Sequence, residues 1–181
     1  MKKSKNLTLF FTVACLCFFC TGCFTDTPYI SYKDTVSHLE IENLLGTWHE
    51  LAQMGRPENE QIAKVTINSH INEKGLIRMT ADLRKYTLFG PLNTKKGTIK
   101  WDENHPGVIK YSFFLNFYTD YFILYLADDY SVFLACNNKA TRLWLLSRDH
   151  NVQKKYLDLM YSKITSLGFD PSNLVWNESY F

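Results

Sequence analysis

Residues 46–54, Gly-Thr-Trp-His-Glu-Leu-Ala-Gln-Met, open a long region in which apolar and polar side chains alternate with a period of two. Such alternation is typical of β-strands that bury one face. Short turns such as 72–75 and 128–130 separate the alternating segments, which favours antiparallel pairing of consecutive strands. The predicted strands are 46–54, 62–72, 75–84, 95–101, 107–115, 120–128, 130–136 and 142–148.

Eight consecutive strands can close into an up-and-down barrel, which leaves no free sheet edge. The interior of such a barrel is just wide enough for side chains or one small ligand. Helical spacing appears only near the end of the chain, where Val152, Tyr156, Met160, Ile164 and Leu167 fall on one stripe. The predicted fold is therefore all-β: an eight-stranded antiparallel up-and-down barrel with a C-terminal α-helix packed on its outside.

The composition excludes several classes of protein. The chain has 181 residues, of which 46% are hydrophobic and 21% charged, so intrinsic disorder is excluded as the main state. The net charge of +2 provides no basic footprint for nucleic acid. The five histidines are scattered, and no Gly-rich phosphate loop or Gly-x-Ser-x-Gly motif occurs. The sequence therefore predicts no metal, no cofactor and no nucleic-acid partner.

The first 22 residues are predicted to be a signal peptide. Lys2, Lys3 and Lys5 precede an apolar run from Leu7 to Cys20, which is the pattern of a secretory signal. The run is too short for a transmembrane helix, which needs about 20 apolar residues. Of the five cysteines, only Cys136 lies beyond residue 23, so no disulfide can form within the mature domain.

The end of this segment resembles a bacterial lipobox, in which small residues precede a cysteine that becomes diacylated. Thr21, Gly22 and Cys23 match the pattern, whereas Cys20 stands where an aliphatic residue is usual. An ordinary signal peptide is the alternative. The resemblance implies a lipid anchor on Cys23. The mostly polar residues that follow predict a tether, so the predicted organisation is a lipidated N-terminus and tether over 23–37 and a folded domain over 38–181. Phe24 stands where Asp would retain a lipoprotein in the inner membrane, which implies export to the outer membrane of a Gram-negative cell. We expect the domain on the periplasmic side of that membrane, with the cell surface as the alternative.

Three short regions together resemble the signature of the lipocalin family. They are Gly46-Thr47-Trp48, Thr119-Asp120-Tyr121 and Ser147-Arg148, and their order and spacing match the family. Within it, the chain is similar to bacterial lipoprotein lipocalins and their apolipoprotein D-like relatives. The resemblance implies that Trp48 plugs the closed end of the barrel with Arg148 across its ring, a contact worth about 0.5–2 kcal/mol. The resemblance likewise implies that Gly46, Thr119 and Asp120 are signature positions with a structural role.

Alternation anchored on an inward Trp48 predicts the cavity wall. It places the carboxylate of Glu50 inside and His49 outside. For each inward residue, filling the core is an alternative to contacting a ligand, and a register error of one residue would exchange the two faces. The predicted ligand-binding residues are Met54, Ile67, Met79, Ile99, Trp101, Tyr111, Phe113, Tyr121, Ile123, Tyr125 and Trp144.

An apolar, aromatic wall suits an acyl chain with a polar head. The predicted function is that of a noncatalytic, membrane-anchored protein that stores or carries fatty acids, lysophospholipids or similar small hydrophobic ligands. One alternative is a filled barrel whose outer surface binds an envelope partner. Another is a thiol-dependent isomerase or peroxidase, for which Cys136 is the only candidate nucleophile.

Overall fold

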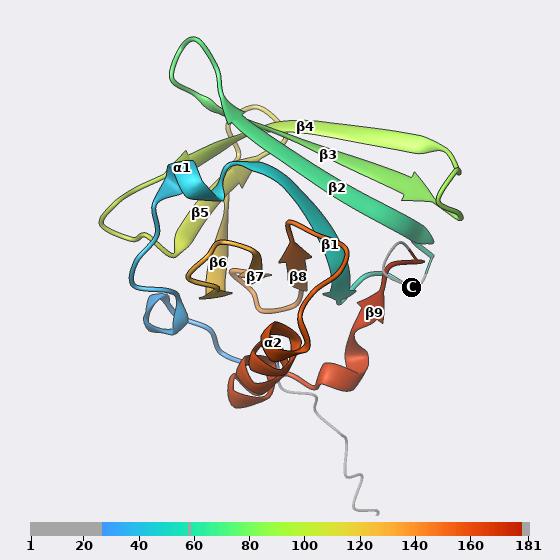
Figure 1. The fold of residues 1–181 in the computed structure, drawn as a ribbon. Helices are drawn as coiled ribbons and strands as arrows, with labels where there is room; N and C mark the ends of the chain where they lie inside the picture. Colours follow the sequence, from blue (N-terminus) through green and yellow to red (C-terminus); the bar gives the residue numbers. More distant parts are fainter. Residues whose placement is uncertain (1–26, 58, 179–181) are drawn as a thin grey trace, which may run out of the picture.

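Eight antiparallel strands follow one another around a closed barrel in the computed structural model, which describes residues 27–57 and 59–178 (Figure 1). Strand β1 pairs with both β8 and β2, which closes the barrel and confirms the predicted fold. The strands are β1 (Gly46–Met54), β2 (Ile62–Ile71), β3 (Ile77–Lys85), β4 (Leu92–Trp101), β5 (Val108–Ser112), β6 (Thr119–Leu126), β7 (Val132–Asn137) and β8 (Leu143–Ser147).

A ninth strand, β9 (Val175–Trp176), was not expected from the sequence. β1 pairs with β2 only over residues 46–49 and with β9 at Ala52 and Gln53. The short strand thus occupies the edge of β1 that β2 has left. It ties the C-terminal segment to the open end of the barrel, where β1 ends and β2 begins.

Three register shifts interrupt the pairing of the barrel strands. One lies at the start of β2, between Ile62 and Lys64, before the residues of that strand predicted to face inward. The other two are β-bulges that reverse the predicted direction of side chains. The pairing of β1 with β8 shifts between Glu50 and Ala52, and that of β6 with β7 shifts between Ile123 and Tyr125. A bulge inserts one extra residue into a strand and so reverses the alternation beyond it. The direction predicted for every residue after the bulge is therefore wrong in both strands.

The C-terminal helix α2 (Lys154–Ser166) packs on the outside of the barrel, as predicted (Figure 1). Its Met160 and Ile164 have no exposed surface and pack in a cluster with Leu134 and Leu145 from the outer faces of β7 and β8. This explains why these strands are apolar on both faces. No helix in the described part of the chain is both long and apolar enough to cross a bilayer.

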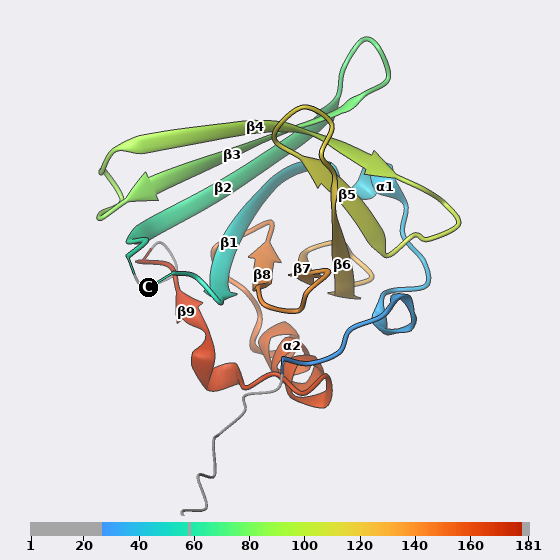
Figure 2. The ribbon, with the colours of Figure 1, turned by 180° about the vertical axis from the view of Figure 1, so that it is seen from behind.

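The segment predicted as a tether is partly packed on the barrel. Residues 1–26, with the predicted signal peptide and Cys23, lie outside the described residues. Ile30 is buried in the cluster beneath α2, and the amide of Val36 donates to the carbonyl of Ile123 at 2.9 Å. The segment contains the short 3-10 helix η1 (Tyr32–Asp34) and runs from beside α2 to α1 (Ile41–Leu44) at the closed end (Figure 2). The packed chain thus begins before residue 38, and both buried clusters consist of residues from Ile30 onward.

Candidate functional site

A cavity of about 260 Å³ lies inside the barrel. All eight barrel strands contribute to its wall, which is mostly aliphatic and aromatic. Trp48 and Leu44 lie at its closed end, and the exposed residues Glu60 and Lys95 bring it to the surface at the open end. The arrangement can enclose an elongated apolar group and leave one end of it near water.

Eight of the eleven residues predicted to bind a ligand line this cavity. They are Ile67, Met79, Ile99, Tyr111, Phe113, Tyr121, Ile123 and Trp144. Met54 and Tyr125 lie beyond the two bulges and pack in the cluster beneath α2, so their predicted inward direction is wrong. Trp101 packs in the closed-end cluster below the cavity, where its indole N–H donates to the carbonyl of Pro106 at 2.9 Å.

The closed end is sealed by Trp48, which is only 2% exposed. Its indole N–H donates to the carbonyl of Leu44 at 2.8 Å, and the guanidinium carbon of Arg148 lies 3.8 Å from its ring centroid. Arg148 also donates to the carbonyls of Asn43 at 2.7 Å and Thr47 at 2.8 Å. These contacts join the start of β1, the end of β8 and the segment before β1 into one floor.

The other signature residues are also held in the framework. Gly46 has a φ of +97°, a conformation that favours glycine, at the point where the chain enters β1 beside Arg148. Thr119 begins β6 at the open end. Asp120 forms an ion pair of 3.6 Å with Lys110, which stands directly opposite on β5.

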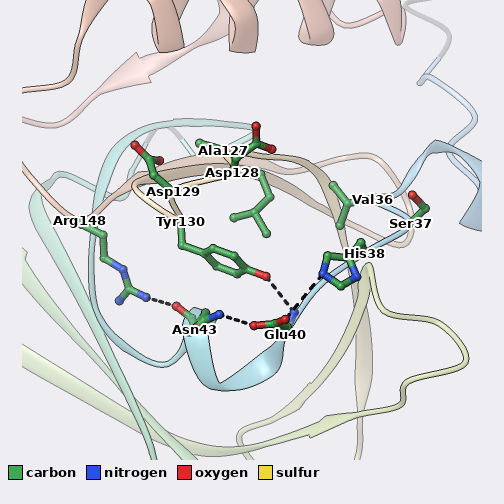
Figure 3. A pocket seen from close by; sticks show the side chains of 11 residues that line it. Val36, Ser37, His38, Glu40, Asn43, Ala127, Asp128, Asp129, Tyr130 and Arg148 are labelled. Carbon is green, nitrogen blue, oxygen red and sulfur yellow. Dashed lines mark hydrogen bonds and ion pairs between the residues drawn. The ribbon is translucent and has the colours of Figure 1, made fainter.

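A second hollow, of about 920 Å³, lies on the surface at the closed end between the segment before β1 and the β6–β7 turn (Figure 3). Several of its polar groups are bound to one another. The Glu40 amide donates to the Tyr130 hydroxyl at 2.9 Å, and the Asn43 side chain donates to Glu40 at 2.6 Å. The lining is a mixture of polar and apolar residues, so this larger hollow offers much less apolar surface to a ligand than the interior cavity.

A buried polar network crosses one side of the cavity wall. The side chains of Glu50 and Arg56 are 4% and 5% exposed and form an ion pair. All five N–H groups of Arg56 donate hydrogen bonds. Glu50 accepts one, the side chain of Gln53 accepts two, and the carbonyl of Ile62 and the side chain of Asn177 accept one each. The Asn177 amide in turn donates to Glu50. Burial raises the pKa of Glu50, and the positive charge of Arg56 opposes that shift.

Most of this network could not be found by sequence reasoning. Alternation correctly places Glu50 inside, but Gln53 faces inward only because of the β1 bulge. Arg56 lies in the loop after β1, and Asn177 follows 121 residues later. The available signal was the polar character of the loop 55–60, whose Arg56 and Glu60 line the cavity.

Two cations at the mouth have no carboxylate partner within the described residues. They are Lys95 on β4 and Arg142 just before β8, and both line the cavity. The Lys95 ammonium lies 5.8 Å from the ring centroid of Phe113. Burial raises the pKa of the Tyr121 hydroxyl, and the nearby charge of Arg142 opposes that shift. The mouth therefore combines apolar surface with free positive charge.

Cys136 is fully buried and packs in the cluster beneath α2, outside the cavity wall. Burial raises the pKa of its thiol to about 12, so the thiol is protonated at neutral pH. Among residues 27–57 and 59–178, no three His, Cys, Asp or Glu side chains come together in a way that could hold a metal ion.

Comparison with known proteins gives a consistent picture. Residues 39–179 match the model of the family described as "Lipocalin-like domain". The chain is 29% identical over 150 residues to a Vibrio cholerae protein named outer membrane lipoprotein Blc, covering 78% of this chain and 83% of that protein. It is 25% identical over 167 residues to the Escherichia coli K12 protein of the same name, and the alignment covers 88% of this chain and 89% of that protein.

Among solved structures, the cockroach allergen Per a 4 aligns with a TM-score of 0.66 over 84% of this chain and 95% of its own, at 15% identity. Insecticyanin from the tobacco hornworm aligns with a TM-score of 0.63 over 79% of this chain and 82% of its own, at 12% identity. At these identities the structures show the fold alone. The family match covers most of the chain, and on that basis this protein is a member of the lipocalin family.

Proposed function

We propose that this protein is a bacterial outer-membrane lipocalin that binds one elongated hydrophobic ligand, such as a fatty acid or a lysophospholipid, and stores or carries it in the cell envelope. The observation that carries the proposal is the apolar cavity of about 260 Å³ that reaches the surface at one end of the barrel. Concave, mostly apolar cavities with a few placed polar groups are typical ligand sites.

The volume of the cavity sets the size of the ligand. A water molecule occupies about 30 Å³ of liquid, so 260 Å³ corresponds to roughly nine groups of that size. At about 0.8 kcal/mol for each buried methylene, nine groups supply roughly 7 kcal/mol before ordering costs, equivalent to a Kd of roughly 10 μM. The cavity therefore suits one alkyl chain, with the head group at the mouth.

The rim of the barrel supports the same kind of ligand. Phe113 lines the cavity and is 49% exposed, and it begins a loop whose Phe114 and Phe117 are also exposed. Apolar surface thus continues from the cavity to the outside of the mouth. An alkyl chain entering from a lipid phase would meet apolar contacts along its whole path.

The envelope location rests on the relatives and on the N-terminal sequence. The Vibrio and Escherichia relatives are named outer membrane lipoproteins. The lipobox-like segment ending at Cys23 supports the same location for this chain. Anchoring through acylated Cys23, on the periplasmic side of the membrane, is part of the proposal, and mass spectrometry of the membrane-extracted protein tests it.

The alternatives have no observation in their favour. A filled barrel would have no measurable void, and the cavity of about 260 Å³ counts against it. A thiol-dependent enzyme would need an accessible thiolate, whereas Cys136 is buried, protonated and outside the cavity wall.

Calorimetric titration of the delipidated chain from residue 24 onward tests the proposal, since this form keeps every described residue. Dodecanoate and lauroyl-lysophosphatidylcholine are expected to bind with micromolar affinity. Met79→Trp places an indole in the cavity and is expected to weaken binding of both at least tenfold. Thr80→Trp is the matched control, because Thr80 neighbours Met79 on β3 and lies outside the cavity lining. Absence of binding by the unmodified chain, or equal affinity of the Met79→Trp variant, would refute the proposal.

A further inference from the structure

Two free polar groups stand side by side at the mouth of the cavity, the guanidinium of Arg142 and the hydroxyl of Tyr121. Both residues line the cavity. On β7, Asn137 stands directly opposite Tyr121 on one side, and its amide donates to the carbonyl of Arg142 on the other at 3.1 Å. The backbones of Tyr121 and Arg142 are thus separated by one intervening strand, or about 10 Å, a distance that their long side chains can bridge.

Neither group is used to hold the fold together. The backbone of Arg142 is bound to Asn137, but its guanidinium has no hydrogen bond or ion pair within the described residues. The Tyr121 ring packs 5.5 Å from that of Trp144, and its hydroxyl likewise has no hydrogen-bond partner there. The Tyr121 hydroxyl is also not sealed from solvent, in contrast to the buried, unpartnered hydroxyl of Tyr111. Arg142 and Tyr121 therefore present unused donors to whatever occupies the mouth.

The other charges that face the cavity leave this positive charge uncancelled. Glu50 and Arg56 neutralise each other in the buried network. Glu60 and Lys95 are both exposed to water, where their opposite charges are screened, and Lys95 stands on β4, on the opposite wall. Arg142 is only partly exposed, so an anion beside it interacts in surroundings less polar than bulk water.

We propose that Arg142 and Tyr121 form an anion-binding subsite that selects alkyl ligands with a carboxylate or phosphate head. The inference rests on the proposed function, because the alkyl chain must occupy the cavity for its head to reach the mouth. A planar guanidinium donates two parallel hydrogen bonds to a carboxylate or phosphate, and a tyrosine hydroxyl adds a third. Lys95 contributes longer-range attraction as an exposed point charge.

Three ligands that share one alkyl chain but differ in head group show how much the head group contributes to affinity. Dodecanoate, dodecyl phosphate and dodecanol are titrated into the delipidated chain from residue 24 onward, at low and at physiological salt. The two anions are expected to bind about tenfold more tightly than the alcohol, a ratio that falls as salt rises. A preference shared by both anions assigns the subsite to anions in general, and a preference for one identifies its head group.

Variants of Arg142 and Tyr121 test whether these two side chains cause the preference for anionic ligands. Arg142→Gln is expected to weaken binding of the anions about tenfold and that of dodecanol by less than twofold. Tyr121→Phe is expected to weaken binding of the anions about threefold. The matched controls are Tyr125→Phe on the outer side of β6 and Lys96→Gln next to Lys95 but outside the cavity lining, and both are expected to stay within twofold for every ligand.

The failure of this inference differs from the failure of the proposed function. If all three ligands bind equally to the unmodified chain, or if Arg142→Gln weakens binding of dodecanol as much as that of dodecanoate, the subsite is refuted while alkyl binding stands. If none of the three binds, the proposed function falls and the subsite falls with it. Thermal unfolding of each variant verifies that it is folded.

Discussion

Replacing Arg56 with methionine is expected to destabilise the barrel in a pH-dependent way. The substitution keeps an apolar stem but leaves the carboxylate of Glu50, 4% exposed, without its counter-charge. Removing one partner of a buried ion pair typically costs about 3–5 kcal/mol. It also leaves the carbonyl of Ile62 and the side chains of Gln53 and Asn177 without the donors that Arg56 supplies.

Protonation of Glu50 limits this cost. At pH 7, protonating a carboxyl group whose ordinary pKa is 4.5 costs about 1.36 kcal/mol for each of 2.5 pH units, or about 3.4 kcal/mol. At pH 5.5 the same calculation gives about 1.4 kcal/mol. The charge part of the destabilisation should therefore fall by about 2 kcal/mol between these pH values.

The sign follows from the direction of the pKa shift. Burial raises the pKa of Glu50 above its value in the unfolded chain, and removing Arg56 takes away the charge that opposes this shift. The folded variant therefore binds more protons than the unfolded variant between the two pKa values. Its stability rises as pH falls through this window and is lost as pH rises through it.

Urea unfolding monitored by tryptophan fluorescence at pH 5.5 and 7 measures the effect. At pH 7 the loss of about 3 kcal/mol should lower Tm by roughly 6–12 °C. The double variant Glu50→Gln/Arg56→Met should lose the pH dependence, and Arg78→Met, at an exposed position, should change stability by less than about 0.5 kcal/mol. A loss in the Arg56→Met variant that is below 1 kcal/mol at pH 7, or the same at both pH values, would refute the reasoning.

Three further predictions concern the framework. Arg148→Ala removes two charge-assisted hydrogen bonds and the contact with the Trp48 ring, so urea unfolding should show a loss of about 2 kcal/mol; a loss below 0.5 kcal/mol would contradict this role. Gly97→Ala places a methyl group against the Tyr111 hydroxyl and the Ser112 carbonyl, closer than atoms normally approach. The overpacking should cost about 1–3 kcal/mol and lower Tm. An unchanged Tm would show that β4 and β5 can separate without cost. Cys136 should resist a thiol reagent at pH 8 in the native protein and react in urea, because burial raises its pKa to about 12; rapid labelling of the native protein would revive thiol chemistry as a hypothesis.

The fold was largely predictable because its evidence is local. Alternation along each segment and short turns between segments imply consecutive antiparallel pairing, and eight such strands close on themselves. The stripe that includes Met160 and Ile164 predicts a helix that must cover an apolar surface, and the structure buries both residues against the outer faces of β7 and β8. The short β9 carries no such signal, since two residues are too few to show a period.

The cavity wall was predictable where alternation continues without a bulge. Ile67, Met79 and Ile99 lie in continuously paired stretches, which in β2 begin after the shift between Ile62 and Lys64, and they face the cavity as alternation predicts. Met54 and Tyr125 follow bulges and face outward. No residue type in either segment marks the extra residue, because a bulge depends on how two strands pair and not on one strand alone.

The sequence by itself therefore determined the kind of fold, the closed end built on Trp48 and Arg148, and an apolar interior. All three depend on periodicity or on motifs whose residues are close in the chain or recur in a fixed order. Only the tertiary structure decided how large the cavity is, that Arg56 meets Glu50 and Asn177 across one wall, and that Arg142 stands free beside Tyr121. These features depend on the shear and closure of the barrel, which bring together residues that no local pattern links.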